Sequence, residues 1–126
     1  MDVRKELQAL GYVHAGAIRP IDSGNSCKPD FNLEVPGYVV FAFVVADRIR
    51  FIGTTGKGLK KRVGAAASAL KGIMENPTGH PLDNFKRFAP AVIKANQEIE
   101  VWARESSASE YQTEKQDLSL KYKPDW

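Results

Sequence analysis

Hydrophobic and polar positions along the chain follow a helical or a strand period in some stretches and neither period in others. In residues 2–10 the apolar side chains recur every three or four positions, which predicts a short helix that ends at Gly11. Residues 15–36 are instead rich in Pro, Gly, Ser, Asn and Asp, a composition typical of a loop or arm. At most a short extended piece over 31–35 is expected within this arm.

Three stretches have the pattern of strands. Residues 38–45 read YVVFAFVV, a continuous run of β-branched and aromatic side chains that is typical of a strand buried on both faces. After a polar break the apolar pattern resumes over 49–52 and ends at Gly53, which predicts a hairpin. Residues 99–103 alternate apolar and polar side chains, so they predict a third strand with one solvent-exposed face.

Helical periodicity dominates three stretches of the second half. Apolar residues form one stripe over 59–74, and another helix is predicted over 82–95, where Pro90 should kink it or start a new segment. A last helix is expected over 109–122, because Pro124 prevents its continuation. The order of these elements predicts an α+β fold, in which helices flank a small three-stranded antiparallel sheet.

Length and composition favour a single compact unit, divided into an N-terminal helix and arm over 1–35 and a domain over 36–126. The lone Cys27 permits no internal disulfide and the first residues lack a secretory signal pattern, so a cytoplasmic (intracellular) protein is expected. No run approaches the roughly 20 apolar residues of a membrane span, so no membrane partner is expected.

The net charge of +3 conceals an uneven distribution. Residues 1–50 carry six basic and six acidic side chains, residues 51–96 carry eight and two, and residues 97–126 carry four and seven. The basic middle suits a phosphate-rich partner, although a solvated face balanced by the acidic end would give the same pattern. Within it, residues 50–63 combine three glycines with cations, so backbone amides and side chains could approach a phosphate together. Their spacing is not that of a P-loop, which argues against nucleotide hydrolysis.

The strand pair and the helix after it resemble the GIY-YIG nuclease superfamily. The residues that carry the likeness are 39–41 (VVF), 51–55 (FIGTT), 59–63 (LKKRV), 99–104 (IEVWAR), Glu114 and 123–126 (KPDW). The resemblance covers residues 36–126 and is nearest to compact, single-domain phage endonucleases. It implies a DNA endonuclease that hydrolyses phosphodiester bonds.

The resemblance also implies a role for individual residues. Arg62 would bind the scissile phosphate through its forked guanidinium and stabilise the developing charge. Glu114 would bind one divalent metal, Mg²⁺ or Mn²⁺, without holding it tightly. Gly53 is the backbone glycine of the second half-motif. Outside this frame, Arg62 would be one more solvated helix cation and Glu114 a surface carboxylate.

Both signature tyrosines of the family are phenylalanine here, Phe41 and Phe51. A phenyl ring keeps the packing but has no proton to transfer. The site is therefore either slow or re-routed, or it belongs to a degenerate protein that binds DNA without cutting it. Tyr38 cannot easily substitute, because its odd offset from Phe41 points it to the opposite face of the strand.

Other groups could compensate for the missing hydroxyls. Tyr111 shares a helical face with Glu114 and could reach the metal or its water, although a packed tyrosine with a wet tip is the commoner arrangement. His80 in the turn 79–81 could act as a base near neutral pH, although a loop histidine is more often simply exposed. A metal-activated water needs no tyrosine.

A group of cations is expected to form a track for the DNA backbone, and ordinary solubility is the alternative role. Such contacts are independent of base sequence and weaken with salt. One site of this class cuts one strand, so a double-strand break would need a homo-oligomer. The expected track consists of Lys57, Lys60, Lys61, Lys86 and Arg87.

A KH-type RNA-binding domain is the remaining alternative, because residues 52–59 fit an I-G-x-x-G-x-x-L pattern. That module places a helix before its GxxG loop, whereas the β-branched and aromatic residues before Gly53 predict a strand. A hairpin over 38–52 would exclude the KH domain.

Overall fold

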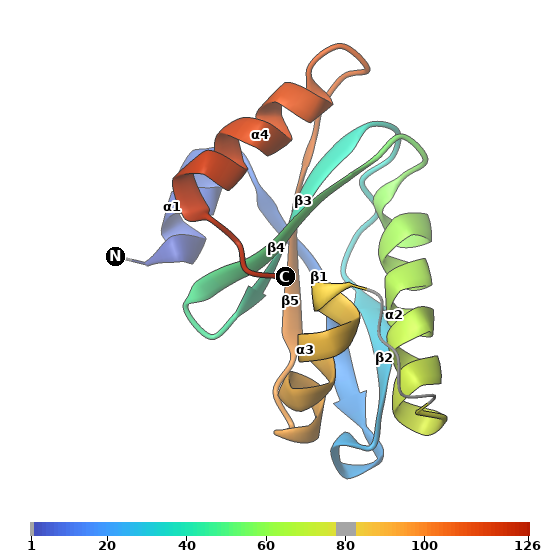
Figure 1. Ribbon diagram of the computed structural model, residues 1–126. Coiled ribbons are helices and arrows are strands. Elements are labelled where there is room, and N and C mark those ends of the chain that lie inside the picture. The colour runs from blue at the N-terminus through green and yellow to red at the C-terminus, as the bar shows by residue number, and fades with distance from the viewer. Residues whose placement is uncertain (1, 78–82) are drawn as a thin grey trace.

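The computed structural model describes residues 2–77 and 83–126 and has an α+β fold (Figure 1). Five strands form one antiparallel sheet in the order β2-β1-β5-β3-β4. Helices α1 and α4 cover one face of this sheet, and α2 and α3 cover the other. The strands are β1 (Val13–Ile21), β2 (Ser26–Phe31), β3 (Val39–Val45), β4 (Arg48–Thr55) and β5 (Ile99–Glu105).

The four helices of the described residues begin close to where their sequence patterns predict, and α4 buries fewer residues than α2 and α3, with Leu118 as its buried side chain. Asp2 and Asp83 cap α1 and α3 by accepting a hydrogen bond from a backbone N–H of the first turn. Pro90 lies inside α3, which continues through it as one helix, so the expected second segment does not form. The helices are α1 (Val3–Ala9), α2 (Leu59–Glu75), α3 (Asn84–Lys94) and α4 (Tyr111–Tyr122).

Strand β3 divides the two halves of the core. Its odd-numbered residues, such as Phe41 and Phe43, pack beneath α2 and α3, and its even-numbered residues, such as Val40 and Ala42, pack beneath α1 and α4. All seven of its residues are buried, which explains the continuous apolar run. Strand β3 pairs with β4 on one side and with β5 on the other. The motif residues of β4 and β5 therefore lie beside β3.

The expected loop over residues 15–36 is wrong, because most of it forms β1 and β2. Gly16, Pro20 and Pro29 of this segment have specific places in the sheet. Gly16 lies at a bulge where a Cβ atom would come within 2.4 Å of the Asp30 carbonyl oxygen. Pro29 lies on the edge strand β2, and Pro20 lies beyond the part of β1 that pairs with β5. The sheet therefore has five strands and not three.

The hairpin β3–β4 forms as expected, which excludes the KH domain because a strand enters Gly53 where that domain needs a helix. The division into 1–35 and 36–126 stays a prediction, although β1 and β2 join the same sheet as the rest. In the described ranges, no helix is both long enough and apolar enough to cross a membrane.

Candidate functional site

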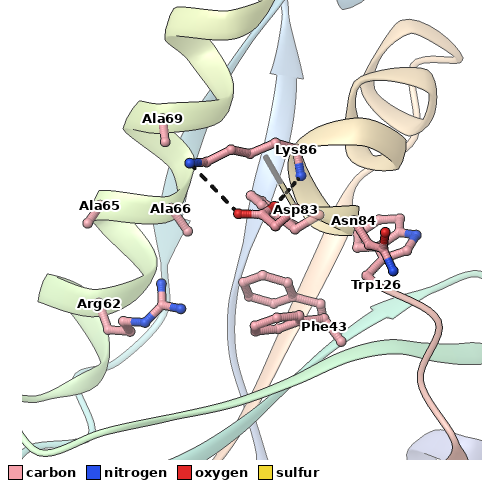
Figure 2. Close-up of a pocket in the computed structure, with 11 residues that line it drawn as sticks. Phe43, Arg62, Ala65, Ala66, Ala69, Asp83, Asn84, Lys86 and Trp126 are labelled. Atoms are coloured by element: carbon pink, nitrogen blue, oxygen red, sulfur yellow. Dashed lines mark hydrogen bonds and ion pairs between the residues drawn. The ribbon is translucent and has the colours of Figure 1, made fainter. Parts of the chain in front are cut away.

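A pocket of about 420 Å³ lies between α2 and α3 over the sheet (Figure 2). Small side chains of α2 form one wall, aromatic rings form the floor, and charged side chains stand at the rim. The residues that line it are Phe43, Phe51, Arg62, Ala65, Ala66, Ala69, Asp83, Asn84, Phe85, Lys86 and Trp126. An apolar pocket with a few convergent polar groups is the usual form of a ligand site.

The floor of the pocket is a cluster of aromatic rings brought together by the hairpin. Phe43 pairs with Phe51 across β3 and β4, and their ring centroids are 5.2 Å apart in a stacked arrangement. Phe85 from α3 lies 5.5 Å from Phe43. Trp126 meets Phe85 edge-on at 5.9 Å. The cluster is therefore assembled from three elements that lie far apart in the sequence.

Residues 125 and 126 hold the indole at the side of the pocket. The Trp126 backbone N–H donates to the Arg50 carbonyl oxygen at 2.8 Å, and the Asp125 carboxylate lies 2.9 Å from Arg50 Nε. Asn84 Nδ2 donates to the Asp125 carbonyl oxygen at 3.3 Å, and the Arg50 guanidinium lies 5.4 Å from the indole centroid. This segment thus links α4, on one face, to the pocket on the other.

Arg62 lies in the first turn of α2 and is half-buried, with its Cζ 5.7 Å from the centroid of the Phe41 ring. Across the pocket, Lys86 Nζ is 3.8 Å from the carboxylate of Asp83 (Figure 2). Over residues 2–77 and 83–126, no acidic side chain forms an ion pair with Arg62. The rim therefore presents an unneutralised guanidinium beside an aromatic floor.

Gly53 has a packing reason to be glycine. A Cβ atom there would lie 2.5 Å from Cζ of Phe41 and 2.8 Å from Cε1 of Phe51. Its absence lets the two rings approach, with centroids 6.0 Å apart. Phe41 is fully buried, and Phe51 is partly exposed at the pocket. The structure thus brings Phe41, Phe51, Gly53 and Arg62 into one place.

Several of the backbone amides expected to approach a phosphate at the start of α2 are occupied by the chain itself. The Glu34 carboxylate accepts hydrogen bonds from the N–H groups of Lys60, at 3.0 Å, and Val35, at 2.9 Å. The N–H of Gly58 donates to the Gly37 carbonyl, and that of Lys57 donates to the Thr55 hydroxyl. Because the chain itself occupies these donors, they are not available to a phosphate.

Glu114 lies on the α1/α4 side of the sheet. One carboxylate oxygen, Oε1, pairs with Nη2 of Arg104 at 2.6 Å, and Nη1 of Arg104 donates to the Leu10 carbonyl. The other oxygen, Oε2, is buried and has no hydrogen-bond partner in the part of the chain described. Tyr12 lies 5.6 Å beneath the Arg104 guanidinium, and burial raises the pKa of this phenol to about 12.

One free carboxylate oxygen fits a metal that takes its remaining ligands from phosphate and water. Within residues 2–77 and 83–126, no group of three or more His, Cys, Asp and Glu side chains could enclose an ion. The chain therefore offers Glu114 as a single ligand, and this fits an ion that is not tightly bound.

Arg62 and Glu114 belong to the same end of β3 but to opposite faces of the sheet. Arg62 is over Phe41, whereas Arg104, the partner of Glu114, pairs in register with the neighbouring Val40. The contacts described include no hydrogen bond or ion pair between Arg62 and Glu114. The two charges therefore lie on different faces of the sheet and do not pair with each other.

Tyr38 points away from Phe41, as its odd offset predicts. Its ring lies 5.0 Å from that of Tyr111, which packs against the α1/α4 half of the core. No hydrogen bond joins Tyr111 to Glu114 among the described contacts, so a role at the metal stays a prediction. His80 lies outside the described residues.

The predicted cations lie near the starts of α2 and α3, and Lys86 among them lines the pocket. Lys57, Lys60 and Lys61 are exposed around the first turn of α2. Lys86 and Arg87 lie in the first turn of α3, where Arg87 lies 6.0 Å from the exposed ring of Phe88. Their positions are compatible with a track that converges on Arg62.

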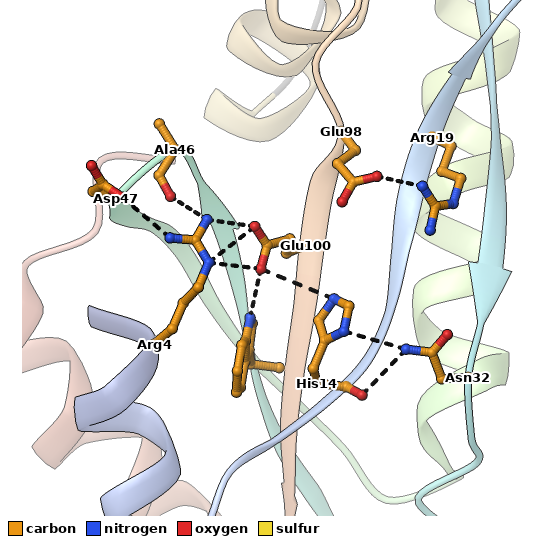
Figure 3. Close-up of polar contacts among 9 residues, drawn as sticks. Arg4, His14, Arg19, Asn32, Ala46, Asp47, Glu98 and Glu100 are labelled. Carbon is orange, nitrogen blue, oxygen red and sulfur yellow. Dashed lines mark hydrogen bonds and ion pairs between the residues drawn. The ribbon is translucent and has the colours of Figure 1, made fainter. Parts of the chain in front are cut away.

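Sequence reasoning missed a polar network on the α1/α4 side (Figure 3). Nε of Arg4 donates to both oxygens of Glu100, at 3.0 and 3.1 Å, and Nε1 of Trp102 donates to the same carboxylate at 3.1 Å. Burial acts to raise the pKa of Glu100, but the hydrogen bonds from Arg4 and Trp102 outweigh it and hold that pKa below its usual value. Residues 96 positions apart gave no local pattern by which to find this network.

The sequence matches no family model and no curated protein. The fold is similar to that of solved structures. A mutant of bacteriophage T4 EndoII aligns with a TM-score of 0.74 over 100% of this chain and 98% of that chain, at 15% identity. The restriction endonuclease HPY188I, in complex with product DNA, aligns with a TM-score of 0.54 over 98% of this chain and 82% of that chain, at 13% identity. The chain therefore shares its fold with these two proteins.

Proposed function

We propose that this protein is a DNA endonuclease of the GIY-YIG type that hydrolyses phosphodiester bonds with a divalent metal. The observation that carries the proposal is the likeness in fold to T4 EndoII over 100% of the chain. The second neighbour, a restriction endonuclease bound to product DNA, supports DNA as the partner. The motif residues Phe41, Phe51, Gly53 and Arg62 lie close together, and Phe51 and Arg62 line the pocket, which supports the assignment of the site.

In this proposal Arg62 binds the scissile phosphate. Its guanidinium offers a planar fork of donors that matches two phosphate oxygens, a geometry that lysine does not provide. Its position beside buried aromatic rings lowers the local dielectric constant and strengthens its interaction with charge that develops in the transition state.

Glu114 would hold Mg²⁺ or Mn²⁺ through its unpartnered Oε2. The ion, when bound, would polarise the phosphoryl oxygen. The scissile phosphate would then lie at the Val39 end of β3, which Arg62 and Glu114 approach from opposite faces. Arg104 would orient the Glu114 carboxylate through its 2.6 Å ion pair.

Phe41 and Phe51 favour a second candidate, a nuclease-fold protein that binds DNA without cutting it. Neither ring can transfer a proton. In the described parts of the chain, no tyrosine hydroxyl forms a hydrogen bond with Arg62 or Glu114. We therefore expect cleavage by the endonuclease to be weak, because neither motif ring can activate the attacking water.

Nicking of supercoiled plasmid with Mg²⁺ or Mn²⁺ tests the proposal. We expect weak nicking by the wild type and a loss of about 10²–10³-fold for Arg62→Ala, because a charge-stabilising donor is removed. Glu114→Ala should abolish nicking, and chelation of the metal should do the same. Lys71→Ala is the matched control, because Lys71 is an exposed cation of the same helix outside the pocket lining and should leave nicking unchanged.

Contrary outcomes separate the two candidates. If no metal supports nicking while the protein still retards DNA on a gel, the binding protein is the better description. Activity created by Phe41→Tyr from none would identify a decayed site on an intact fold. Nicking that survives Arg62→Ala at the wild-type rate would overturn the assignment of the site.

Two further expectations belong to this proposal. One site of this kind cuts one strand, so double-strand cleavage would require a homo-oligomer, which sedimentation at the assay concentration would detect.

The buried, free thiol of Cys27 fits a cytoplasmic location.

A further inference from the structure

We propose that the pocket between α2 and α3 takes a nucleobase that is unstacked from the DNA helix, held between the alanine wall and the Phe51 ring. The inference rests on the proposed function in one respect, that DNA is the partner. It adds a feature of the substrate, an extrahelical base beside the phosphate that Arg62 binds.

The pocket is open because of the residues that α2 presents to it. Ala65, Ala66 and Ala69 follow Arg62 along this side of the helix, and none extends beyond a methyl group (Figure 2). Protein interiors are otherwise closely packed, so a space of about 420 Å³ between two helices lacks side chains that would ordinarily fill it. This volume falls within the range of small-molecule sites, roughly 300–1,000 Å³.

The floor is suited to stacking. Phe51 is partly exposed at the pocket, and the ring of Phe43, which stacks against it, is 1% exposed. The buried Phe43 ring therefore supports Phe51 from below and holds it at the pocket surface. Trp126 adds a second aromatic surface, fixed by its contacts with Arg50 and Phe85. Aromatic side chains bind unstacked bases of any sequence, since every base has a π-face.

The rim is suited to the phosphate attached to such a base. Arg62 and Lys86 reach over the pocket from α2 and α3 (Figure 2). Asp83 lies beside Lys86 at 3.8 Å, which reduces the repulsion that its carboxylate would exert on a phosphate. Asn84 donates through Nδ2 to the Asp125 carbonyl, which leaves its amide oxygen to accept from the amino edge of a base.

Metal-free binding to two duplexes tests the inference. One duplex is fully paired, and the other carries a single unpaired nucleotide, which costs little to unstack. In EDTA, fluorescence anisotropy should give about fivefold or tighter binding to the duplex with the unpaired nucleotide, the lower end of what stacking of one base provides. Ala66→Leu should fill the pocket and abolish this preference, so that the two duplexes bind with equal affinity.

Ser68→Leu is the matched control, because Ser68 is exposed on the same helix and does not line the pocket. It adds the same side chain and should keep the preference. Equal wild-type affinity for the two duplexes would overturn the inference, and so would a preference that persists in a folded Ala66→Leu variant.

Photo-crosslinking of the wild type gives a test that needs no variant. An unpaired 5-iododeoxyuridine should crosslink to Phe51 or Trp126, as mass spectrometry of the peptides would show, and a crosslink elsewhere would contradict the pocket assignment. Because both measurements exclude metal, they are independent of cleavage. A binding preference for the unpaired nucleotide without nicking would support the base pocket and contradict the endonuclease. Nicking without this preference would support the endonuclease and contradict the base pocket.

Discussion

The two faces of the sheet differ in how their charged side chains are satisfied. On the α1/α4 face, Arg4 pairs with Glu100 and Arg104 pairs with Glu114. On the α2/α3 face, Arg62 stands over an aromatic ring at the rim of an open pocket and has no acidic partner among the residues described. Burial is similar for these three arginines, all of which are partly exposed.

The comparison shows that the partner, and not the residue type, separates a structural arginine from a candidate functional one. A paired arginine stabilises the fold, because its removal leaves a partly buried carboxylate without a partner. An unpaired arginine beside a cavity contributes little to folding and is available to an anionic ligand.

The largest effect is expected for Gly53→Ala, which would disrupt the aromatic floor on the α2/α3 face. The added methyl group would come within 2.5 Å of the Phe41 ring, and that ring is buried and cannot move aside. We expect a loss of about 3 kcal/mol in the free energy of unfolding, measured by urea titration. Gly64→Ala is the control, because Gly64 is helical with open space around it and should gain about 1 kcal/mol. Equal effects at both glycines would mean that the rings are not packed as described.

A smaller effect separates the arginines of the two faces. Arg104→Ala would leave the Glu114 carboxylate partly buried and without its partner, so we expect a loss of about 2 kcal/mol in the free energy of unfolding. Arg62→Ala should cost less than about 1 kcal/mol, since it removes one cation–π contact. Chemical denaturation of both variants measures the difference, and a reversed order of stability would break the comparison.

The smallest effect concerns the Tyr12 phenol beneath Arg104. Burial raises its pKa to about 12 in the folded protein, against 10.0 for an unperturbed tyrosine. Because the folded pKa is the higher one, this contribution to stability is complete below pH 10 and is lost as the pH rises through 12. At pH ~11 the loss is about 1.4 kcal/mol.

Tyr12→Phe should remove that part of the alkaline destabilisation, as thermal melts at neutral and alkaline pH would show. Absorbance of tyrosinate provides the direct readout, with one phenol titrating near pH 12 in the wild type and absent from the variant. If the two proteins lose stability in parallel, the phenol is not buried as described.

Much of the fold could be predicted because the periodic stretches are long. The run 38–45 and the stripe 59–74 match β3 and α2 closely, since burial on both faces of a strand or on one side of a helix leaves a direct mark in the sequence. Strands β1 and β2 could not be found in this way. Pro20 and Pro29 argue against strands, because proline has no N–H to donate to a neighbouring strand. The strand pairing shows that Pro29 lies on an edge strand and that Pro20 lies beyond the residues of β1 that pair with β5.

The site was predictable in part for the same reason. Local motifs grouped Phe41, Phe51, Gly53 and Arg62, and these residues lie close together in the fold, although their roles stay a prediction. The motif order could not show that Glu114 approaches from the other face, because the face covered by a helix depends on the path of the chain and not on spacing. The alanine wall was also missed, since Ala65, Ala66 and Ala69 are indistinguishable from helix-forming residues until α3 lies opposite them.

The strand order has a consequence for how the chain folds. Strands β1 and β2 form one hairpin, β3 and β4 form another, and β5 lies between β1 and β3. A nascent chain that ends before residue 99 therefore lacks β5, the strand that joins the two hairpins. Isolated hairpins are marginally stable. Closure waits for a segment made more than forty residues after β4, so the final step links distant parts of the chain and should be slow.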